Sequence, residues 1–178
     1  MKKPSKEQLE AAWNKTVPDL IAPGLRILFC GINPSLYSAA VGHHFARPGN
    51  RFWPTLAAAG LTDRLLHPSE EHLLLEQGLG ITNIVDRATA AASDLAPEEL
   101  TQGVAALERK LLAYRPHRLA VLGVGAYRTG FGVRDARLGR QPEDFGGAEV
   151  WVLPNPSGLN AHYQLPALAE LFSRLRHA

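Results

Sequence analysis

Four short hydrophobic runs divide the chain and predict buried β-strands. They cover residues 26–32 (RILFCGI), 80–85 (GITNIV), 118–124 (RLAVLGV) and 149–154 (EVWVLP). All but the second are nearly continuous in Val, Ile, Leu and Phe. That pattern is typical of strands that are buried on both faces of a parallel sheet.

Amphipathic patterns with helical spacing alternate with these strands. They predict helices over residues 51–61, 69–79, 97–114 and 165–178. Because strands and helices alternate, we expect an α/β fold with three layers, in which helices cover both faces of a central four-stranded, mainly parallel sheet. Residues 132–147 form the longest irregular segment and are expected to be a loop at the surface.

The composition is that of a globular domain. The chain has 178 residues, of which 46% are hydrophobic and 20% charged, enough to bury a sizeable core. We find no internal repeat, low-complexity tract or linker, and we therefore expect one domain over residues 1–178. The net charge of +2 is too small to indicate a polyanionic partner by itself.

Three further observations restrict the compartment and the cofactors. Cys30 is the only cysteine, which excludes a disulfide and a cysteine-based metal cluster. No apolar run approaches the about 20 residues of a membrane span, and the N-terminus lacks the apolar region of a signal peptide. We expect a cytoplasmic protein without a membrane partner, and nothing in the sequence calls for a metal or a cofactor.

Two predicted strands end in the same tripeptide, Asn-Pro-Ser, at residues 33–35 and 155–157. Ligands of α/β folds bind at the carboxyl ends of the strands, so two such loops could frame one cleft. The amide of Asn33 could place a water molecule or the edge of a base, although Asn-Pro alone often opens a turn. Leu159, at the tip of the second loop, could act as a wedge between base pairs, although single exposed leucines are common.

The loop GHHFARPGNRFW, residues 42–53, carries an aromatic side chain that could meet a planar ligand. Phe45 could stack on such a ligand, whereas Phe52 and Trp53 are expected in the core. The adjacent histidines of this loop lack a third ligand at metal-binding spacing, so no metal site is predicted.

Carboxylates are scarce near the predicted strand ends. Asp86, in NIVDRAT, is the best placed to reach a shared cleft as a general base, although it could instead pair with Arg87. Asp94 lies further along the same loop and is the weaker candidate.

Taken together, GINPS, FARPGNRFW, GITNIVDRAT and NPSGL resemble the mismatch-specific uracil-DNA glycosylases, which are relatives of the thymine-DNA glycosylases. The similarity runs in family order from about Arg26 to the C-terminal helix. It implies a uracil-DNA glycosylase fold and a monomeric enzyme that acts on double-stranded DNA with mismatched or damaged bases. The reaction would be hydrolysis of the N-glycosidic bond of a flipped uracil, leaving an abasic site.

Matched by position, the resemblance implies a role for particular residues. Asn33 would position the attacking water, and Thr89 would be a second contact to it. That Asp86 adds general-base help, if it reaches the water, is a separate hypothesis, because many relatives manage without a carboxylate base. The residues expected to bind the base are Ile32, Ser38, Phe45, Asn83 and Asn155. The residues expected to form the DNA wedge are Ser157, Gly158 and Leu159.

Two departures from the family pattern concern specificity. The wedge continues LNAHY, without the arginine that some relatives place just after the leucine, so recognition of the opposing guanine could differ. The GHHF segment is closer to the thymine-DNA glycosylase version, which could widen the substrate range.

Two other classes of protein stay open on the sequence alone. The GVGA segment at residues 123–126 is part of a dinucleotide-binding pattern and would fit a nucleotide-binding α/β protein, although it lacks the full motif. The same loops could also serve a DNA-binding module without catalysis.

Overall fold

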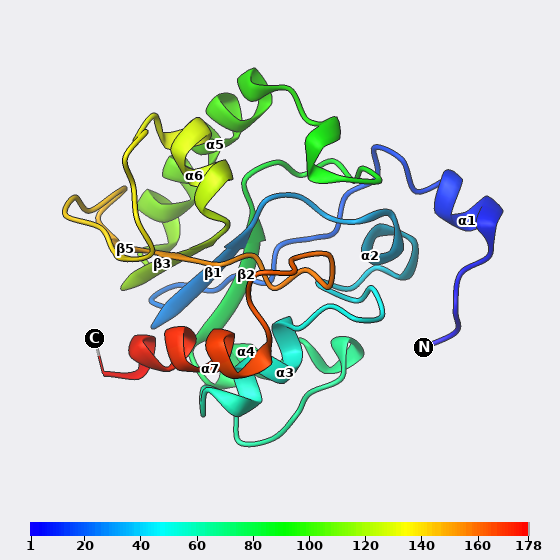
Figure 1. Cartoon of the computed structure of the whole chain (residues 1–178), viewed down its shortest axis with the longest axis horizontal. Coiled ribbons are helices and arrows are strands. Elements are labelled where there is room, and N and C mark those ends of the chain that lie inside the picture. The colour runs from blue at the N-terminus through cyan, green and yellow to red at the C-terminus, as the bar shows by residue number, and fades with distance from the viewer. Residues whose placement is uncertain (178) are drawn as a thin grey trace.

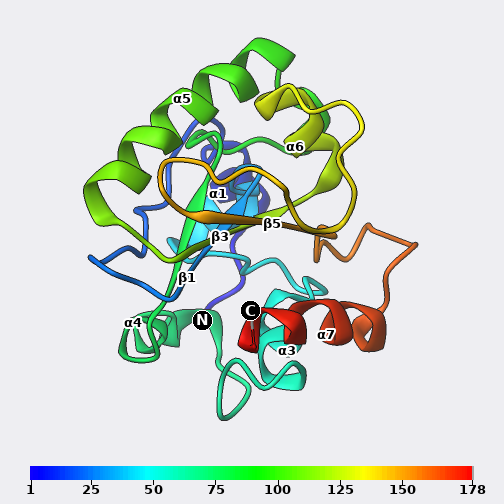
Figure 2. The ribbon, with the colours of Figure 1, turned by 90° about the vertical axis from the view of Figure 1, so that its left-hand side faces the viewer.

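The protein folds into three layers, as the computed structural model of residues 1–177 shows (Figure 1). A central sheet separates α5 (Pro97–Tyr114) and α6 (Val124–Phe131) from the helices on the opposite face. Those helices are α3 (Phe52–Ala58), α4 (Leu73–Glu76) and α7 (Leu165–Ser173), and the layering is seen end-on in Figure 2. The expected α/β architecture is confirmed.

The sheet has five strands in the order β2-β1-β3-β5-β4. The four predicted strands are present as β1 (Ile27–Gly31), β2 (Leu79–Asn83), β3 (Arg118–Leu122) and β5 (Glu149–Leu153), all mutually parallel. The predicted number of four strands is wrong, because β4 (Gly139–Arg140) pairs antiparallel with β5 within the segment that we expected to be irregular. A strand of two residues has no hydrophobic run by which a sequence pattern could reveal it.

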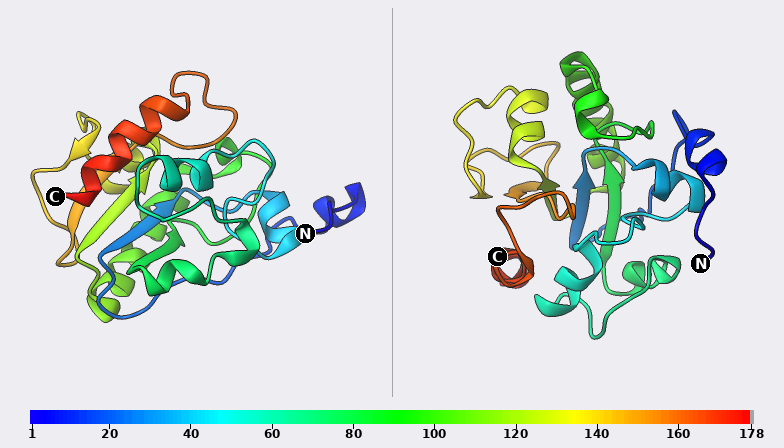
Figure 3. Two further views of the ribbon diagram at one scale, coloured as in Figure 1. Left: turned by 90° about the horizontal axis from the view of Figure 1, so that it is seen from below. Right: turned by 45° about the vertical axis from the view of Figure 1, so that its right-hand side comes forward.

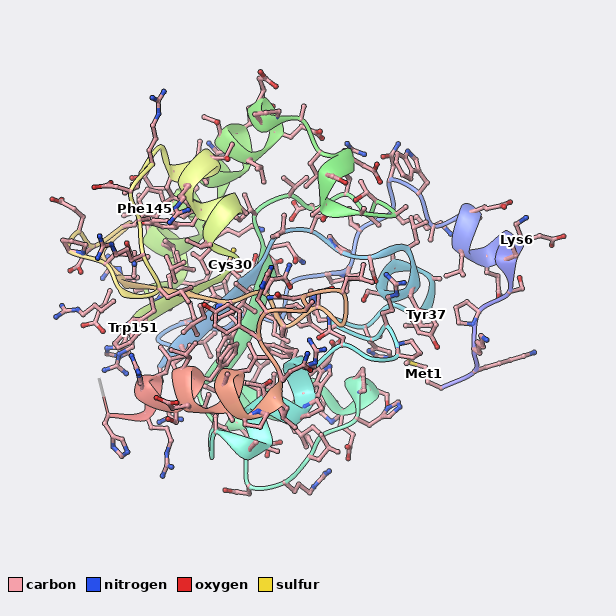
Figure 4. All side chains as sticks on the ribbon, in the orientation of Figure 1. Met1, Lys6, Cys30, Tyr37, Phe145 and Trp151 are labelled. Carbon is pink, nitrogen blue, oxygen red and sulfur yellow. The ribbon has the colours of Figure 1, made fainter. Side chains whose placement is uncertain are left out.

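The parallel strands are hydrophobic on both sides because each side meets a helical layer. In β1, Ile27 and Phe29 face the core beside α3 and α7, whereas Leu28 and Cys30 face the core beneath α5. The same alternation with period two runs through β3 and β5. Figure 4 shows Cys30 in the interior of the molecule, where burial raises the pKa of its thiol, as expected for a core side chain.

The helix predictions hold to different degrees. Residues 97–114 form α5 as predicted, while α3 is shorter than its predicted range. The predicted helix over 69–79 is instead a 3₁₀ turn at Pro68–Glu70 followed by α4, and the C-terminal helix ends at Ser173 before another 3₁₀ turn. Further short elements are α1 (Lys6–Glu10), α2 (Leu36–Val41) and a 3₁₀ turn at Ala92–Asp94, which are too short for a periodic pattern.

Helix packing closes the two outer layers. α3 packs on α7, and α5 packs on α6. The N-terminal segment and the end of α7 lie far apart along the long axis of the molecule (Figure 3, left). Within residues 1–177, no helix combines the length and the apolar character needed to cross a membrane.

Candidate active site

A cavity of about 220 Å³ opens where β1, β2 and β5 end. Its wall is built from the loops that follow these three strands, which lie near one another on the right of Figure 1. Most of the residues proposed from the sequence line it: Ile32, Asn33, Ser38, Phe45, Asn83, Thr89, Asn155, Ser157 and Leu159. Among residues 1–177, no acidic side chain lines the cavity, and neither does any part of 123–128.

The Asn33 side chain is held in one orientation by the loop after β2. Its Nδ2 donates to the backbone carbonyl of Arg87 at 3.0 Å and to Oγ1 of Thr89 at 2.8 Å. A carbonyl can only accept, so the nitrogen must face Arg87. Oδ1 then points away from this loop, and within residues 1–177 it accepts no hydrogen bond. Oδ1 of Asn33 is therefore free to accept a hydrogen bond from a group bound in the cavity.

Thr89 is buried, and its hydroxyl is already committed. Oγ1 accepts from Asn33 and donates to the carbonyl of Ala91 at 2.7 Å. Its hydrogen is therefore unavailable to a water molecule. Thr89 acts on the site mainly by holding Asn33.

The loop after β2 is itself anchored by an ion pair. Arg87 donates to both carboxylate oxygens of Glu99 on α5, at 2.6 and 2.9 Å. These bonds lower the pKa of Glu99 from its ordinary 4.5 to about 2. Asp94 accepts from the backbone N–H of Ala91 at 2.9 Å, which closes the loop's last turn.

Phe45 presents an aromatic face with a strained backbone. Its φ is +51°, a region that residues other than glycine rarely occupy. One face of the ring stacks on Phe52, with centroids 4.1 Å apart, and the ring also lines the cavity. Its backbone N–H donates no hydrogen bond within residues 1–177.

The strained position of Phe45 is enforced by bonds to both of its neighbours. The backbone N–H of His44 donates to Glu71 at 2.9 Å, and the His44 carbonyl accepts from the indole of Trp53 at 3.1 Å. On the other side, the Ala46 N–H donates to Oγ of Ser38 at 3.1 Å. Strain that is maintained by so many contacts is characteristic of a functional site.

Asn83 is a buried carboxamide, only 5% exposed, that lines the cavity at the end of β2. In the described part of the chain its carboxamide makes no hydrogen bond, and its polar atoms stay accessible through the cavity. A Cβ at Gly31 would come within 2.5 Å of Asn83 Oδ1 and 3.2 Å of the Phe45 ring. Glycine at 31 therefore allows the amide and the aromatic ring to close over the strand end.

Asn155 organises the second loop. Its Oδ1 accepts from the backbone N–H of Ser157 at 3.0 Å, and its carbonyl accepts from Asn160 Nδ2 at 3.0 Å. A backbone N–H can only donate, so Nδ2 of Asn155 is left for the cavity it lines. Leu159 lies at the tip of this loop and is 73% exposed.

The carboxylates proposed from the sequence are not brought to the cavity. Asp86 is 62% exposed and pairs with Lys110 at 3.5 Å, and neither it nor Asp94 lines the cavity. Gly158 is also outside the lining, because it packs against Gly49. The hypothesis that Asp86 supplies a general base therefore has no support in the geometry.

Besides Ser35, three polar side chains of the lining were not proposed from the sequence. His44 is buried with Nε2 2.8 Å from the carbonyl of Pro18, so that nitrogen carries the hydrogen. Arg47 is exposed at the mouth, and Asn50 caps the first turn of α3 by accepting from the Phe52 N–H. No local pattern distinguishes these residues, since their placement depends on how the loop after β1 folds back.

The fold and the cavity together define a class of protein. It is a three-layer α/β fold whose strand ends enclose an aromatic face and fixed amide groups, with no acidic side chain among the described lining residues. Such a cavity suits a flat polar heterocycle. The family model of the uracil DNA glycosylase superfamily matches residues 18–176, and the chain belongs to that superfamily. Membership indicates a DNA glycosylase, a hydrolase that acts on DNA.

A solved structure supports the same fold. The chain is similar to the solution NMR structure of a candidate uracil DNA glycosylase from Methanosarcina acetivorans, with a TM-score of 0.61 and 21% sequence identity. The match covers 92% of this chain and 99% of that one.

Proposed function

We propose that the protein, acting as a monomer, excises uracil from double-stranded DNA, with a preference for uracil in G·U mismatches. The observation that carries the proposal is the fixed amide of Asn33, whose oxygen is free to accept a hydrogen bond in a cavity that has no acidic side chain among its described lining residues. The uracil would be flipped out of the duplex into this cavity. Opening a base pair costs a few kcal/mol, and least for a mispaired base, which favours the G·U pair.

In this proposal the flipped base stacks on the open face of Phe45, whose other face rests on Phe52. The free N–H of Phe45 and the backbone of Ile32 would meet polar groups on the base's edge. The carboxamide of Asn83 offers both a donor and an acceptor, and a bound base would satisfy its hydrogen-bonding groups.

The chemistry would rest on placement of water and on stabilisation of the leaving group. Oδ1 of Asn33 would accept a hydrogen bond from a water molecule whose oxygen attacks the sugar C1′. The bond from C1′ to the base nitrogen breaks with its electron pair passing to the base, and the water gives up a proton to solvent. Nδ2 of Asn155 is a donor that could meet the developing negative charge.

The absence of acids among the described lining residues is consistent with this mechanism. A carboxylate beside the base would oppose an anionic leaving group, whereas amides and backbone N–H groups stabilise one. Because an amide is not a strong base, we expect a slow enzyme.

Ser38 would set the tolerance for substituents on the base. Its side chain is small, lines the cavity and is fixed by accepting from Ala46 and from the Ser35 hydroxyl at 3.1 Å. In the family arrangement this position lies beside C5 of the pyrimidine. We propose that modest 5-substituents are accepted more readily than bulky ones.

Single-turnover excision from matched oligonucleotides would test the proposal. The substrates would carry G·U, A·U, G·T and single-stranded uracil, and we expect release of uracil to be fastest from G·U. Equal rates from G·U and A·U would contradict the mismatch preference. Binding to abasic or mismatched DNA without excision of any base would indicate a DNA-binding module instead.

A further inference from the structure

Arg51, in the FARPGNRFW segment, has no role in the mechanism above. It precedes α3 and does not line the cavity. Its side chain is partly buried, and its Nη1 donates to three backbone carbonyls, those of Ser157 and Asn160 at 3.1 Å and of Tyr163 at 3.3 Å. All three belong to the loop that carries Leu159. One guanidinium therefore holds three points of a loop that lies more than a hundred positions further along the chain.

The local helix does not account for a cation at this position. A positive charge at a helix N-terminus is unfavourable, because the partial charge of the backbone there is also positive. The Arg51 side chain makes no capping hydrogen bond to α3. Within residues 1–177 it also forms no ion pair with a carboxylate. Its hydrogen bonds go to the Leu159 loop alone.

Two backbone contacts join the same two loops. The N–H of Arg51 donates to the carbonyl of Pro156 at 2.9 Å. Gly158 lies so close to Gly49 that a Cβ would come within 2.6 Å of the Gly49 carbonyl oxygen. The Leu159 loop is thus seated against the loop that also carries Phe45.

Charge-assisted bonds to three carbonyls attach a loop whose other hydrogen bonds are mostly internal. Within that loop, Ser157 Oγ accepts from the Leu159 N–H at 3.2 Å, and the Asn160 N–H donates to the Ser157 carbonyl at 3.0 Å. These bonds shape the turn but do not attach it to the body of the protein. Attachment comes from Arg51, from the close approach to Gly49 and from Tyr163, which packs against the core beside α3 and α7.

We propose that Arg51 is a positioning residue that locks the Leu159 loop in the orientation needed to enter the DNA duplex. The role of Leu159 as a wedge rests on the proposed function. The neighbours of Arg51 tie this loop to the pocket, since Asn50 lines the cavity and Phe52 supports the Phe45 ring. Entry of the wedge and seating of the base are then coupled through one rigid segment.

A double-mutant cycle with Arg51→Met and Leu159→Ala tests the coupling in single-turnover excision from G·U duplex. Loss of the charge-assisted bonds should slow Arg51→Met by about ten- to a hundredfold. The double variant should be no slower than Leu159→Ala alone, since an unanchored loop cannot use its wedge. The inference would be overturned if the rate loss of the double variant equalled the product of the two single-variant losses. An Arg51→Met rate equal to that of the wild type would also overturn it.

Hydrogen exchange gives a readout that does not depend on activity. In Arg51→Met, the backbone amides of Leu159, Asn160 and His162 should exchange faster, while those of the sheet stay protected. Arg174→Met is the matched control, because that exposed arginine pairs with Glu170 on α7 and, among residues 1–177, has no hydrogen bond to the Leu159 loop. Unchanged exchange in the 157–163 segment would contradict the anchoring, even if the wild-type protein excised no base. Wild-type inactivity on every substrate would instead refute the proposed function.

Two further variants cover the case that Arg51→Met does not fold. Arg51→Lys keeps the charge and offers three hydrogens to three carbonyls, so it should stay within about tenfold of the wild-type rate. Gly158→Ala leaves Arg51 intact but pushes the loop from Gly49, so it should speed exchange of the same amides. If the amides of the Leu159 loop exchanged quickly in Arg51→Lys while excision stayed at the wild-type rate, the positioning role would be refuted.

Discussion

The two Asn-Pro-Ser segments have the same sequence and the same location at a strand end, yet they use their amides in opposite ways. Asn33 gives both hydrogens of Nδ2 to the loop after β2, which leaves its oxygen free. Asn155 gives its oxygen to the turn that it begins, which leaves its nitrogen free. One loop thus offers the cavity an acceptor and the other offers a donor.

The difference arises from the partners and not from the tripeptide. Asn33 meets a carbonyl from a distant segment, which forces its nitrogen outward from the cavity, whereas Asn155 meets an N–H two residues away. The serines differ too, since Ser35 caps α2 and Ser157 closes a turn that leads into no helix. An attacking water molecule needs a hydrogen-bond acceptor, whereas a leaving anion needs a donor. The Asn33 loop is suited to supply the acceptor and the Asn155 loop the donor.

The largest expected effect comes from removing the acceptor. Asn33→Ala should slow single-turnover excision from G·U duplex by about a thousandfold, because the water loses its positioning group. Affinity for uncleaved duplex, measured by fluorescence anisotropy, should change little. If binding were lost and the rate at saturation kept, Asn33 would be a base-binding residue and the contrast between the loops would fail.

The donor of the second loop can be removed without disturbing its turn. Asn155→Asp keeps an oxygen for the Ser157 N–H but replaces the cavity-facing nitrogen with a charged oxygen. We expect about a hundredfold slower excision, since a donor to the leaving base is lost and a like charge is added. Thermal unfolding should be close to wild type. An unchanged rate would show that Asn155 serves the turn alone.

The hydrogen bonds that orient the Asn33 side chain can be weakened by a substitution that keeps the shape of the Thr89 side chain. Thr89→Val removes the hydroxyl that accepts from Asn33, while the Arg87 carbonyl still fixes the nitrogen. The variant also loses the bond from the Thr89 hydroxyl to the Ala91 carbonyl. We expect excision to slow about tenfold, since each lost hydrogen bond typically costs about 1 kcal/mol. Ser157→Ala is the matched change in the other loop, where only the N–H of exposed Leu159 loses a partner, and it should have the smaller effect. The reverse order would mean that the wedge loop is more sensitive than the water-positioning loop.

The sequence predicted the strands and α5 well because their hydrophobic periods are long enough to recognise. It also predicted that the two Asn-Pro-Ser ends would share one cleft, since parallel strands end at one edge of the sheet. It could not predict the direction of either amide. That direction depends on Arg87, which the fold brings to Asn33 across 54 positions.

The same limit applies to Asp86, whose surroundings the sequence did not reveal. From its position just after β2 it could have turned toward the cavity, but Lys110 on α5 pairs with it at the surface. Arg51, by contrast, was not proposed as a site residue although the structure gives it three partners. These partners are backbone carbonyls, which no pattern of side chains reveals.

The smallest expected effect comes from removing the Asp86 carboxylate, which tests whether the Asn33 loop supports excision without a general base. Asp86→Asn should leave the single-turnover rate within about twofold of wild type, since an exposed ion pair contributes little and the residue is outside the cavity. Lys110 would keep its shorter contact to Asp19 at 2.7 Å, so the fold should be unaffected. The measurement is the pH profile of single-turnover excision for both proteins. A large loss in the variant, together with a missing acidic limb, would restore Asp86 as a base and remove the case for catalysis by the Asn33 amide alone.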